Sequence, residues 1–318
     1  MLTFWLRQYV GRAFRPGVAL LLWLTSALLT ASAVLAVSPP GQVFKGGIET
    51  VEVIVTVTDA TGRLVGGLTQ ADFEVFEDGD LQPITHFTGD RVPVSLGVLV
   101  DISDSMRGKP IVDARAALAH FVGDLLDVRD EVFVGAFNHN SQPITSWTRP
   151  PAELRTALDG RQPSGGTAIY DAIVGSLDAF GKRANGRAAL VVISDGADTA
   201  SDTTVRQVQD RLRRTDAFVY AIAIDAESTQ RRATRVNPDA LRELTTPTGG
   251  YTEVVQSAAD LPSATQRIAR ELNAQYSIGY MAPHPADGRW RSIRVRARGA
   301  GLITRSRRGY YAVQVYRK

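Results

Sequence analysis

The fold is decided by Val94-Ser95-Leu96-Gly97-Val98-Leu99-Val100-Asp101-Ile102-Ser103-Asp104-Ser105-Met106, where an apolar run leads into a cluster of oxygen-bearing side chains. A nearly continuous apolar run is typical of a parallel strand that is covered on both faces. Further strands of this kind are expected at 131–137, 188–193 and 217–224, and helices at 111–126, 151–158, 168–180, 204–213, 238–244 and 259–273. Strands and helices in alternation predict an α/β fold with a doubly wound, mostly parallel sheet flanked by helices.

Antiparallel β patterns lie on both sides of this α/β segment. In the N-terminal β segment, residues 48–92, apolar and polar side chains alternate with a period of two over 48–90, and Asp78-Gly79 predicts a hairpin between 73–77 and 82–87. The β pattern returns over 275–318, with strands expected at 276–280, 290–297 and 310–316. Neither flank has enough strands to be stable alone. We therefore expect the flanks to pair into one small β-sandwich, with residues 93–274 inserted between them.

Composition excludes several classes of site. The 318 residues include no cysteine and only four histidines, all far apart, which excludes disulfide scaffolds, thiolate metal sites, cysteine nucleophiles and HExxH zinc sites. The formal net charge of +3 comes from three arginines near the start, so the remainder is neutral and shows no nucleic-acid footprint. Residues 289–318 hold ten bases and no acid, but the arginines alternate along strands. That pattern favours a solvated sheet face over a patch for an anionic lipid, glycan or nucleic acid.

Residues 1–36 predict a secretory signal peptide. Three arginines precede an apolar run, and small-residue cleavage sites end at Ala33 and Ala36. The alternative is an uncleaved anchor over residues 18–37, which is about long enough to span a bilayer. In both cases the rest of the chain is expected to be exported, to the periplasm, the cell surface or the medium, with residues 37–47 as a linker.

Oxygen-bearing side chains recur where strands end and helices begin. Asp101, Ser103 and Ser105 follow the first buried strand, Ser164-Gly165-Gly166-Thr167 opens the helix expected from residue 168, and Ser194-Asp195-Gly196 follows another strand. In open α/β sheets, ligands bind beyond the carboxyl ends of the strands. The first motif alone fits a helix cap equally well, but three motifs at ends that converge favour a ligand site. Hydroxyl and carboxylate oxygens suit Mg²⁺ or Mn²⁺ and suit zinc poorly.

The three motifs together resemble the von Willebrand factor A domain with its metal-ion-dependent adhesion site, and the flanks resemble those of exported bacterial A-domain proteins. The family pattern would make Ser103 and Ser105 direct ligands, with Thr167 ligating directly in one state and through water in the other. It would make Asp101 and Asp195 act through bridging waters and by holding the serine hydroxyls. The resemblance therefore implies bound Mg²⁺, or alternatively Mn²⁺ or Ca²⁺, with an open position for an Asp or Glu carboxylate of a partner protein.

This resemblance implies a non-enzymatic, metal-dependent protein-binding or adhesion module of the bacterial cell envelope. A structural scaffold of an envelope complex, in which the metal only stabilises the fold, is the alternative. A metal-dependent phosphoryl-transfer or hydrolase enzyme is least favoured, because none of the four lysines is placed to neutralise a phosphate beside Asp101. The sequence also lacks G-x-S-x-G, Walker A and G-x-G-x-x-G motifs.

Two further features stay open at this point. Asp225 and Glu227 follow another strand end, where they form either caps and solvated acids or a second cation site. In the family, the terminal helix, here about 259–273, can shift when the metal coordination changes. The resemblance thus implies that ligand binding could reorient the β-sandwich relative to the α/β segment.

Overall fold

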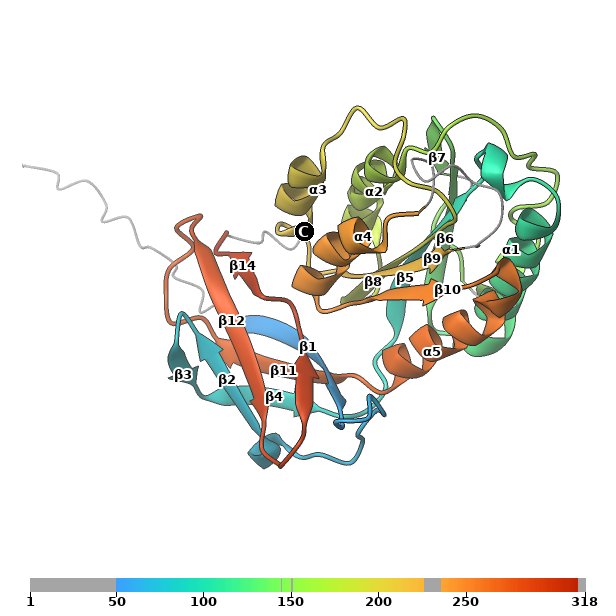
Figure 1. Ribbon diagram of the computed structural model, residues 1–318. Helices are drawn as coiled ribbons and strands as arrows, with labels where there is room; N and C mark the ends of the chain where they lie inside the picture. Colours follow the sequence, from blue (N-terminus) through green and yellow to red (C-terminus); the bar gives the residue numbers. More distant parts are fainter. Residues whose placement is uncertain (1–49, 144, 150, 226–235, 314–318) are drawn as a thin grey trace, which may run out of the picture. The chain divides into compact units, whose positions relative to one another are not determined.

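A six-stranded sheet forms the centre of the α/β segment in the computed structural model, which describes residues 50–143, 145–149, 151–225 and 236–313 (Figure 1). Its strands are β5 (Val94–Asp101), β6 (Glu131–Phe137), β7 (Ser141–Pro143), β8 (Arg187–Ser194), β9 (Phe218–Ile224) and β10 (Thr252–Val255). The order is β10-β9-β8-β5-β6-β7, and only the edge strand β7 is antiparallel. Every residue of β5, β6, β8 and β9 is buried, as expected of strands covered on both faces.

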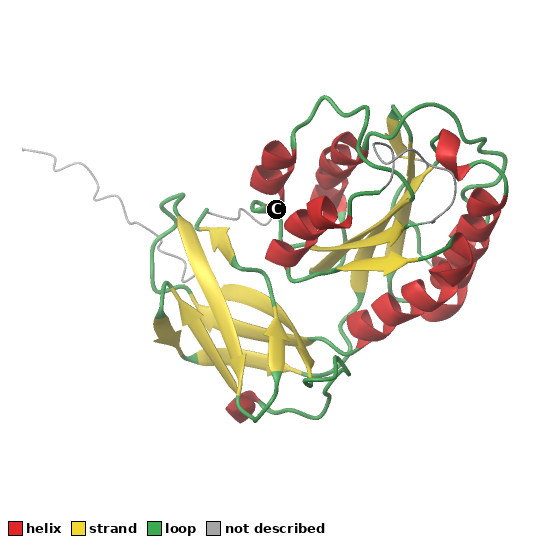
Figure 2. Ribbon diagram, viewed as in Figure 1, coloured by secondary structure: helices red, strands yellow, loops and turns green. Residues whose placement is uncertain are grey.

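Helices cover both faces of this sheet, which confirms the predicted doubly wound fold (Figure 2). The α-helices are α1 (Lys109–His120), α2 (Ile169–Leu177), α3 (Val205–Leu212), α4 (Pro238–Thr245) and α5 (Leu261–Asn273). Short 3₁₀ or π turns are found at Gln70–Asp72, Asp104–Met106, Phe121–Leu125, Pro151–Leu154, Asp178–Lys182, Thr246–Thr248 and Ala258–Asp260. Successive residues of β5 point to opposite layers, so Val98 packs in the apolar core with α1 and α5, and Leu99 in the core with α2, α3 and α4.

The helix expected at 151–158 is wrong in its type. Only Pro151–Leu154 is helical, as a 3₁₀ turn, and successive i→i+3 hydrogen bonds then continue to residue 161. This tighter winding still buries both Leu154 and Leu158 in the core. The apolar spacing was therefore a sound guide to burial, although it misled about the hydrogen-bonding pattern.

The two flanks pair with each other, as predicted. Their strands are β1 (Thr50–Thr58), β2 (Phe73–Glu77), β3 (Asp80–Gln82), β4 (Ile84–Thr88), β11 (Tyr276–Met281), β12 (Trp290–Ala297), β13 (Ile303–Arg305) and β14 (Gly309–Tyr311). They form two antiparallel sheets, β13-β1-β11-β4 and β14-β12-β2-β3, and each sheet takes strands from both flanks. One apolar core serves both sheets, with Val53 and Ile278 from the first and Val75 and Val295 from the second.

The predicted hairpin between 73–77 and 82–87 is wrong in its second strand. After the Asp78-Gly79 turn the chain returns as β3, which pairs with β2, whereas β4 pairs with β11 in the other sheet. Pro83 separates β3 from β4. Proline has no backbone N–H to donate to a ladder, so the chain changes sheets at this position.

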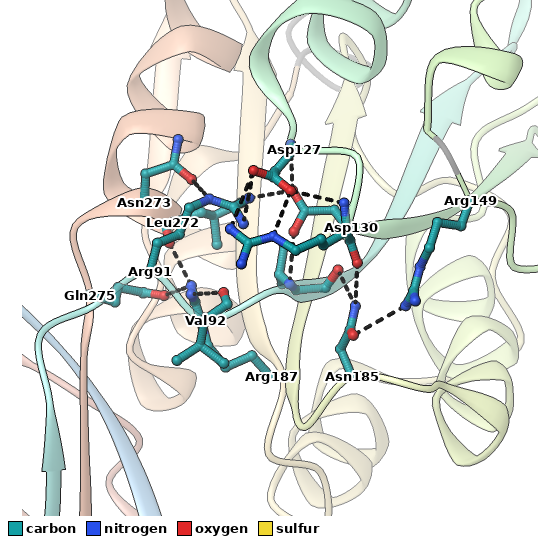
Figure 3. Close-up of polar contacts among 12 residues, drawn as sticks. Arg91, Val92, Asp127, Asp130, Arg149, Asn185, Arg187, Leu272, Asn273 and Gln275 are labelled. Carbon is teal, nitrogen blue, oxygen red and sulfur yellow. Dashed lines mark hydrogen bonds and ion pairs between the residues drawn. The ribbon is translucent and has the colours of Figure 1, made fainter.

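Polar contacts secure the points where the chain enters and leaves the α/β segment (Figure 3). Asp130, which is buried, pairs with Arg91. Arg187, also buried, donates to the carbonyl oxygen of Val92 at 2.6 Å and to the side-chain oxygen of Gln275 at 2.5 Å. Burial lowers the pKa of Arg187 to about 10, which leaves the guanidinium charged at neutral pH. One buried cation thus holds the incoming and the outgoing chain together.

A second polar junction lies at the end of α5. Glu271 is buried, and its Oε1 accepts hydrogen bonds from Thr56 of β1 at 3.1 Å and from the hydroxyl of Tyr220 of β9 at 3.0 Å. Its other carboxylate oxygen pairs with Arg305 of β13. One carboxylate therefore contacts both the parallel sheet and the β-sandwich.

No helix within the described ranges is long and apolar enough to cross a membrane. The predicted signal peptide or anchor and the linker, residues 1–47, lie outside those ranges. The segment boundaries predicted from the sequence stay predictions.

Candidate metal centre

The candidate site begins with Asp101, the last residue of β5. Its side chain is fully buried, and Oδ1 accepts a hydrogen bond from the Ser103 N–H at 2.7 Å. Oδ2 accepts one from the Ser194 hydroxyl at 2.6 Å. Ser194 is the last residue of β8, which is the parallel neighbour of β5. The ends of two adjacent strands therefore fix the orientation of this carboxylate.

The two serines of the first motif continue the cluster toward β8. Ser103 is 1% exposed, and its hydroxyl oxygen lies 3.0 Å from that of Ser105. The Ser105 hydroxyl donates to Oδ1 of Asp195 at 2.6 Å. Asp195 is buried and follows β8 directly. Ser103, Ser105 and Asp195 thus form a continuous row of oxygen atoms.

The glycine-rich loop brings Thr167 to the same place. Gly165 has a φ of +76°, a conformation that favours glycine, and its carbonyl oxygen accepts from the Asp104 N–H at 2.9 Å. Thr167 is buried, and its N–H donates to the Thr199 hydroxyl at 3.1 Å. A Cβ at Gly196 would lie 3.0 Å from the Thr167 hydroxyl oxygen. The absent side chain at Gly196 therefore leaves room for the threonine beside Asp195.

The electrostatics of the site favour a cation. Burial, together with the nearby charge of Asp195, raises the pKa of Asp101 to about 7 against the lowering effect of hydrogen bonds from Ser194 and Ser103. A divalent cation would stabilise both carboxylates in their ionised form. Hydroxyl and carboxylate oxygens are also the donors that Mg²⁺ and Ca²⁺ take in proteins.

The structure brings all five predicted residues to one edge of the sheet. Hydrogen bonds connect Asp101 to Ser103, Ser103 to Ser105, and Ser105 to Asp195. The Thr167 hydroxyl lies beside Gly196, the residue after Asp195. The role of Ser194 in holding Asp101 was missed, although its position just before Asp195 at a strand end was a usable signal. Asp225 and Glu227 were considered above as a second cation site. The Asp225 N–H donates to the Val255 carbonyl oxygen at 2.8 Å, and Glu227 lies outside the described residues.

Fold and site together define an α/β protein with an oxygen-rich cluster at the carboxyl ends of its parallel strands. The family model of the von Willebrand factor type A domain matches residues 96–267, which is more than half of the chain. The chain belongs to this family.

Three solved structures to which this chain is similar are as follows. The conserved hypothetical protein BatB from Bacteroides thetaiotaomicron is 21% identical, with 56% of this chain and 97% of that chain covered and a TM-score of 0.46. An aerotolerance-related membrane protein from Bacteroides fragilis NCTC 9343 is 21% identical, with 57% and 98% covered and a TM-score of 0.47. A von Willebrand factor type A protein from Catenulispora acidiphila is 12% identical, with 79% and 71% covered and a TM-score of 0.51. A search of the curated proteins found no match.

Proposed function

We propose that this chain is a non-enzymatic, divalent-metal-dependent protein-binding module of the bacterial cell envelope. Its metal-ion-dependent adhesion site would hold Mg²⁺, or alternatively Mn²⁺ or Ca²⁺, through Asp101, Ser103, Ser105, Thr167 and Asp195. The observation that carries the proposal is the row of oxygen atoms from Ser103 through Ser105 to Asp195, beside the buried carboxylate of Asp101. The envelope location rests on the signal peptide or anchor predicted within residues 1–37.

The donor chemistry explains why binding, and no reaction, is the proposed activity. The hydroxyls of Ser103, Ser105 and Thr167 are neutral, so a metal held by them keeps much of its positive charge. An Asp or Glu carboxylate of a partner protein is then the natural further ligand. In the alternative function, a scaffold, the metal would stabilise the fold and the partner would bind elsewhere.

Calorimetric titration of the protein with Mg²⁺ and Mn²⁺ tests the metal site. We expect saturable binding that is lost in Ser103→Ala and in Asp195→Ala, while the circular dichroism spectrum stays unchanged. Ser176→Ala is the matched control, because Ser176 is also buried but its hydroxyl donates to the Ile173 carbonyl oxygen of its own helix. Equal metal binding by Ser103→Ala and the wild type would refute the assignment.

Partner capture with and without a chelator then separates adhesion from scaffolding. If the metal coordinates the partner, Ser103→Ala lowers partner binding although the protein stays folded. If the protein is a scaffold, the complex persists in this variant as long as the protein is folded.

A further inference from the structure

A second group of metal-ligating side chains lies in the β-sandwich. Glu77 is the last residue of β2, Asp78 begins the turn into β3, and His284 lies in the connection from β11 to β12. One ligand atom from each residue lies within 4.8 Å of the other two. The pairing of β2 with β12 brings these distant parts of the sequence together.

Glu77 has a carboxylate oxygen without a hydrogen bond. The residue is 1% exposed, and its Oε2 accepts from the hydroxyls of Tyr280 at 2.5 Å and Tyr310 at 3.1 Å. Its Oε1 is equally buried, yet it has no hydrogen-bond partner among the residues that the structure describes. A buried carboxylate oxygen is costly to leave unsatisfied. A cation bound between Glu77, Asp78 and His284 would satisfy it.

Asp78 offers a carboxylate oxygen within 4.8 Å of a carboxylate oxygen of Glu77. Within the described ranges it is the only non-glycine residue with a positive φ, of 50°. The N–H of Ser292 donates to Oδ1 of Asp78 at 2.8 Å and fixes the orientation of the carboxylate. Arg291 lies 3.6 Å from Oδ2, but it also pairs with Asp287 at 2.7 Å. Arg291 therefore keeps its ion pair with Asp287 if Asp78 binds a metal ion.

His284 supplies the third ligand from a constrained loop. It is exposed and lies between Pro283 and Pro285, which restrict the backbone on both sides and lower the entropy lost on binding. At zinc–ligand distances of about 2.0–2.2 Å, tetrahedral ligand atoms lie roughly 3.4 Å apart. The ligand atoms, which lie within 4.8 Å of one another, have to approach by up to about 1.4 Å, and rotation of the exposed imidazole contributes to this approach.

We propose that Glu77, Asp78 and His284 bind a divalent transition-metal ion, for which Zn²⁺ is the best match. Two carboxylates and one imidazole belong to this class of ion, because imidazole suits zinc and its neighbours, whereas Mg²⁺ and Ca²⁺ take oxygen ligands. Tyr280 and Tyr310 orient the Glu77 carboxylate, in the manner of outer partners that hold metal ligands in place. The ion would join the β2–β3 turn to the β11–β12 connection, independently of the site at the strand ends.

Calorimetric titration of the tag-free full chain with Zn²⁺, in excess Mg²⁺, tests this proposal. We expect one Zn²⁺ per chain and a higher melting temperature with zinc. In His284→Ala the affinity should fall at least about 100-fold, and folding should be unaffected because the residue is exposed. Asp78→Asn should also weaken binding, since asparagine tolerates the positive φ but lacks the charge.

His86→Ala is the matched control, because His86 is an exposed histidine of β4 in the same sandwich. Zinc binding should be unchanged in this variant and in Ser103→Ala, which separates this site from the proposed adhesion site. The proposal is overturned if the wild type binds no zinc, or if His284→Ala binds it as tightly as His86→Ala.

Discussion

Replacing Asp101 with asparagine should stabilise the metal-free protein above pH 7. Burial beside Asp195 raises the pKa of Asp101 from its ordinary value of 3.8 to about 7. Between these two values the folded protein keeps a proton on Asp101 that the unfolded chain has already released. The free energy of unfolding therefore falls as the pH rises from about 4 to about 7, and the loss is complete above that range.

The size of the effect follows from the two pKa values. The difference between 3.8 and about 7 corresponds to about 4 kcal/mol, at about 1.4 kcal/mol per pH unit. Asparagine can keep both contacts, because its oxygen accepts from the Ser103 N–H and its amide donates to the Ser194 hydroxyl. Hydrogen bonds to an amide are weaker than those to a carboxylate. We therefore expect a net gain of about 2–4 kcal/mol for Asp101→Asn at pH 8.

Urea unfolding with a chelator present, at pH 5 and pH 8, measures this difference. The variant should exceed the wild type clearly at pH 8 and only slightly at pH 5, with equal m-values. Added Mg²⁺ should stabilise the wild type and leave Asp101→Asn unchanged. If the variant is no more stable than the wild type at pH 8 without metal, the buried-charge reasoning is wrong.

Three other substitutions test the packing and polar contacts. Gly196→Ala places a Cβ 3.0 Å from the Thr167 hydroxyl, so calorimetry should show Mg²⁺ affinity reduced about tenfold; unchanged affinity would contradict this. Gly250→Ala places a Cβ 1.9 Å from the Val219 carbonyl oxygen, so urea unfolding should show a loss above about 3 kcal/mol, and a loss below about 1 kcal/mol would count against the packing argument. Glu271→Ala leaves two buried hydroxyls without their acceptor and removes the ion-pair partner of the partly buried Arg305. It should cost about 3–5 kcal/mol, and a melting temperature equal to that of the wild type would refute the role of this junction.

The central sheet was predictable because its signal is local. The buried strands β5, β6, β8 and β9 are each a nearly continuous apolar run, and a helical pattern separates most of them. Strands β10 and β13 were missed, since they span only Thr252–Val255 and Ile303–Arg305, too few residues to show a period. The predicted partner of β2 was wrong because Pro83 has no backbone N–H to continue the ladder. The alternation of apolar and polar side chains contains no information about backbone donors.

The candidate metal centre was predictable for a similar reason, whereas the group around Glu77 was not. The ends of parallel strands meet by topology, so three short motifs were enough to place Asp101 and Asp195 together. In the sequence, Glu77 is the last residue of a predicted hairpin strand, where a polar side chain is ordinary and indicates no site. Its burial depends on Tyr280 and Tyr310, which approach it only through the pairing of the two flanks. The sequence predicted that the flanks pair, because neither is stable alone, but it did not predict which residues face each other.

The expected shift of α5 gains a physical constraint from the structure. The candidate metal centre lies at the carboxyl end of β5, and the Arg187 contacts lie at its amino end, about 23 Å away for a strand of eight residues. The helix α1, which follows the Ser103 loop, packs in the same core as α5. The last turn of α5 is tied to β1 and β13 through Glu271. If α5 shifts with metal coordination, it must therefore either break these buried contacts or carry β1 and β13 with it. The first course would lose the hydrogen bond of Glu271 to Thr56 and its ion pair with Arg305. We therefore expect a shift that began at the metal to move the β-sandwich as well.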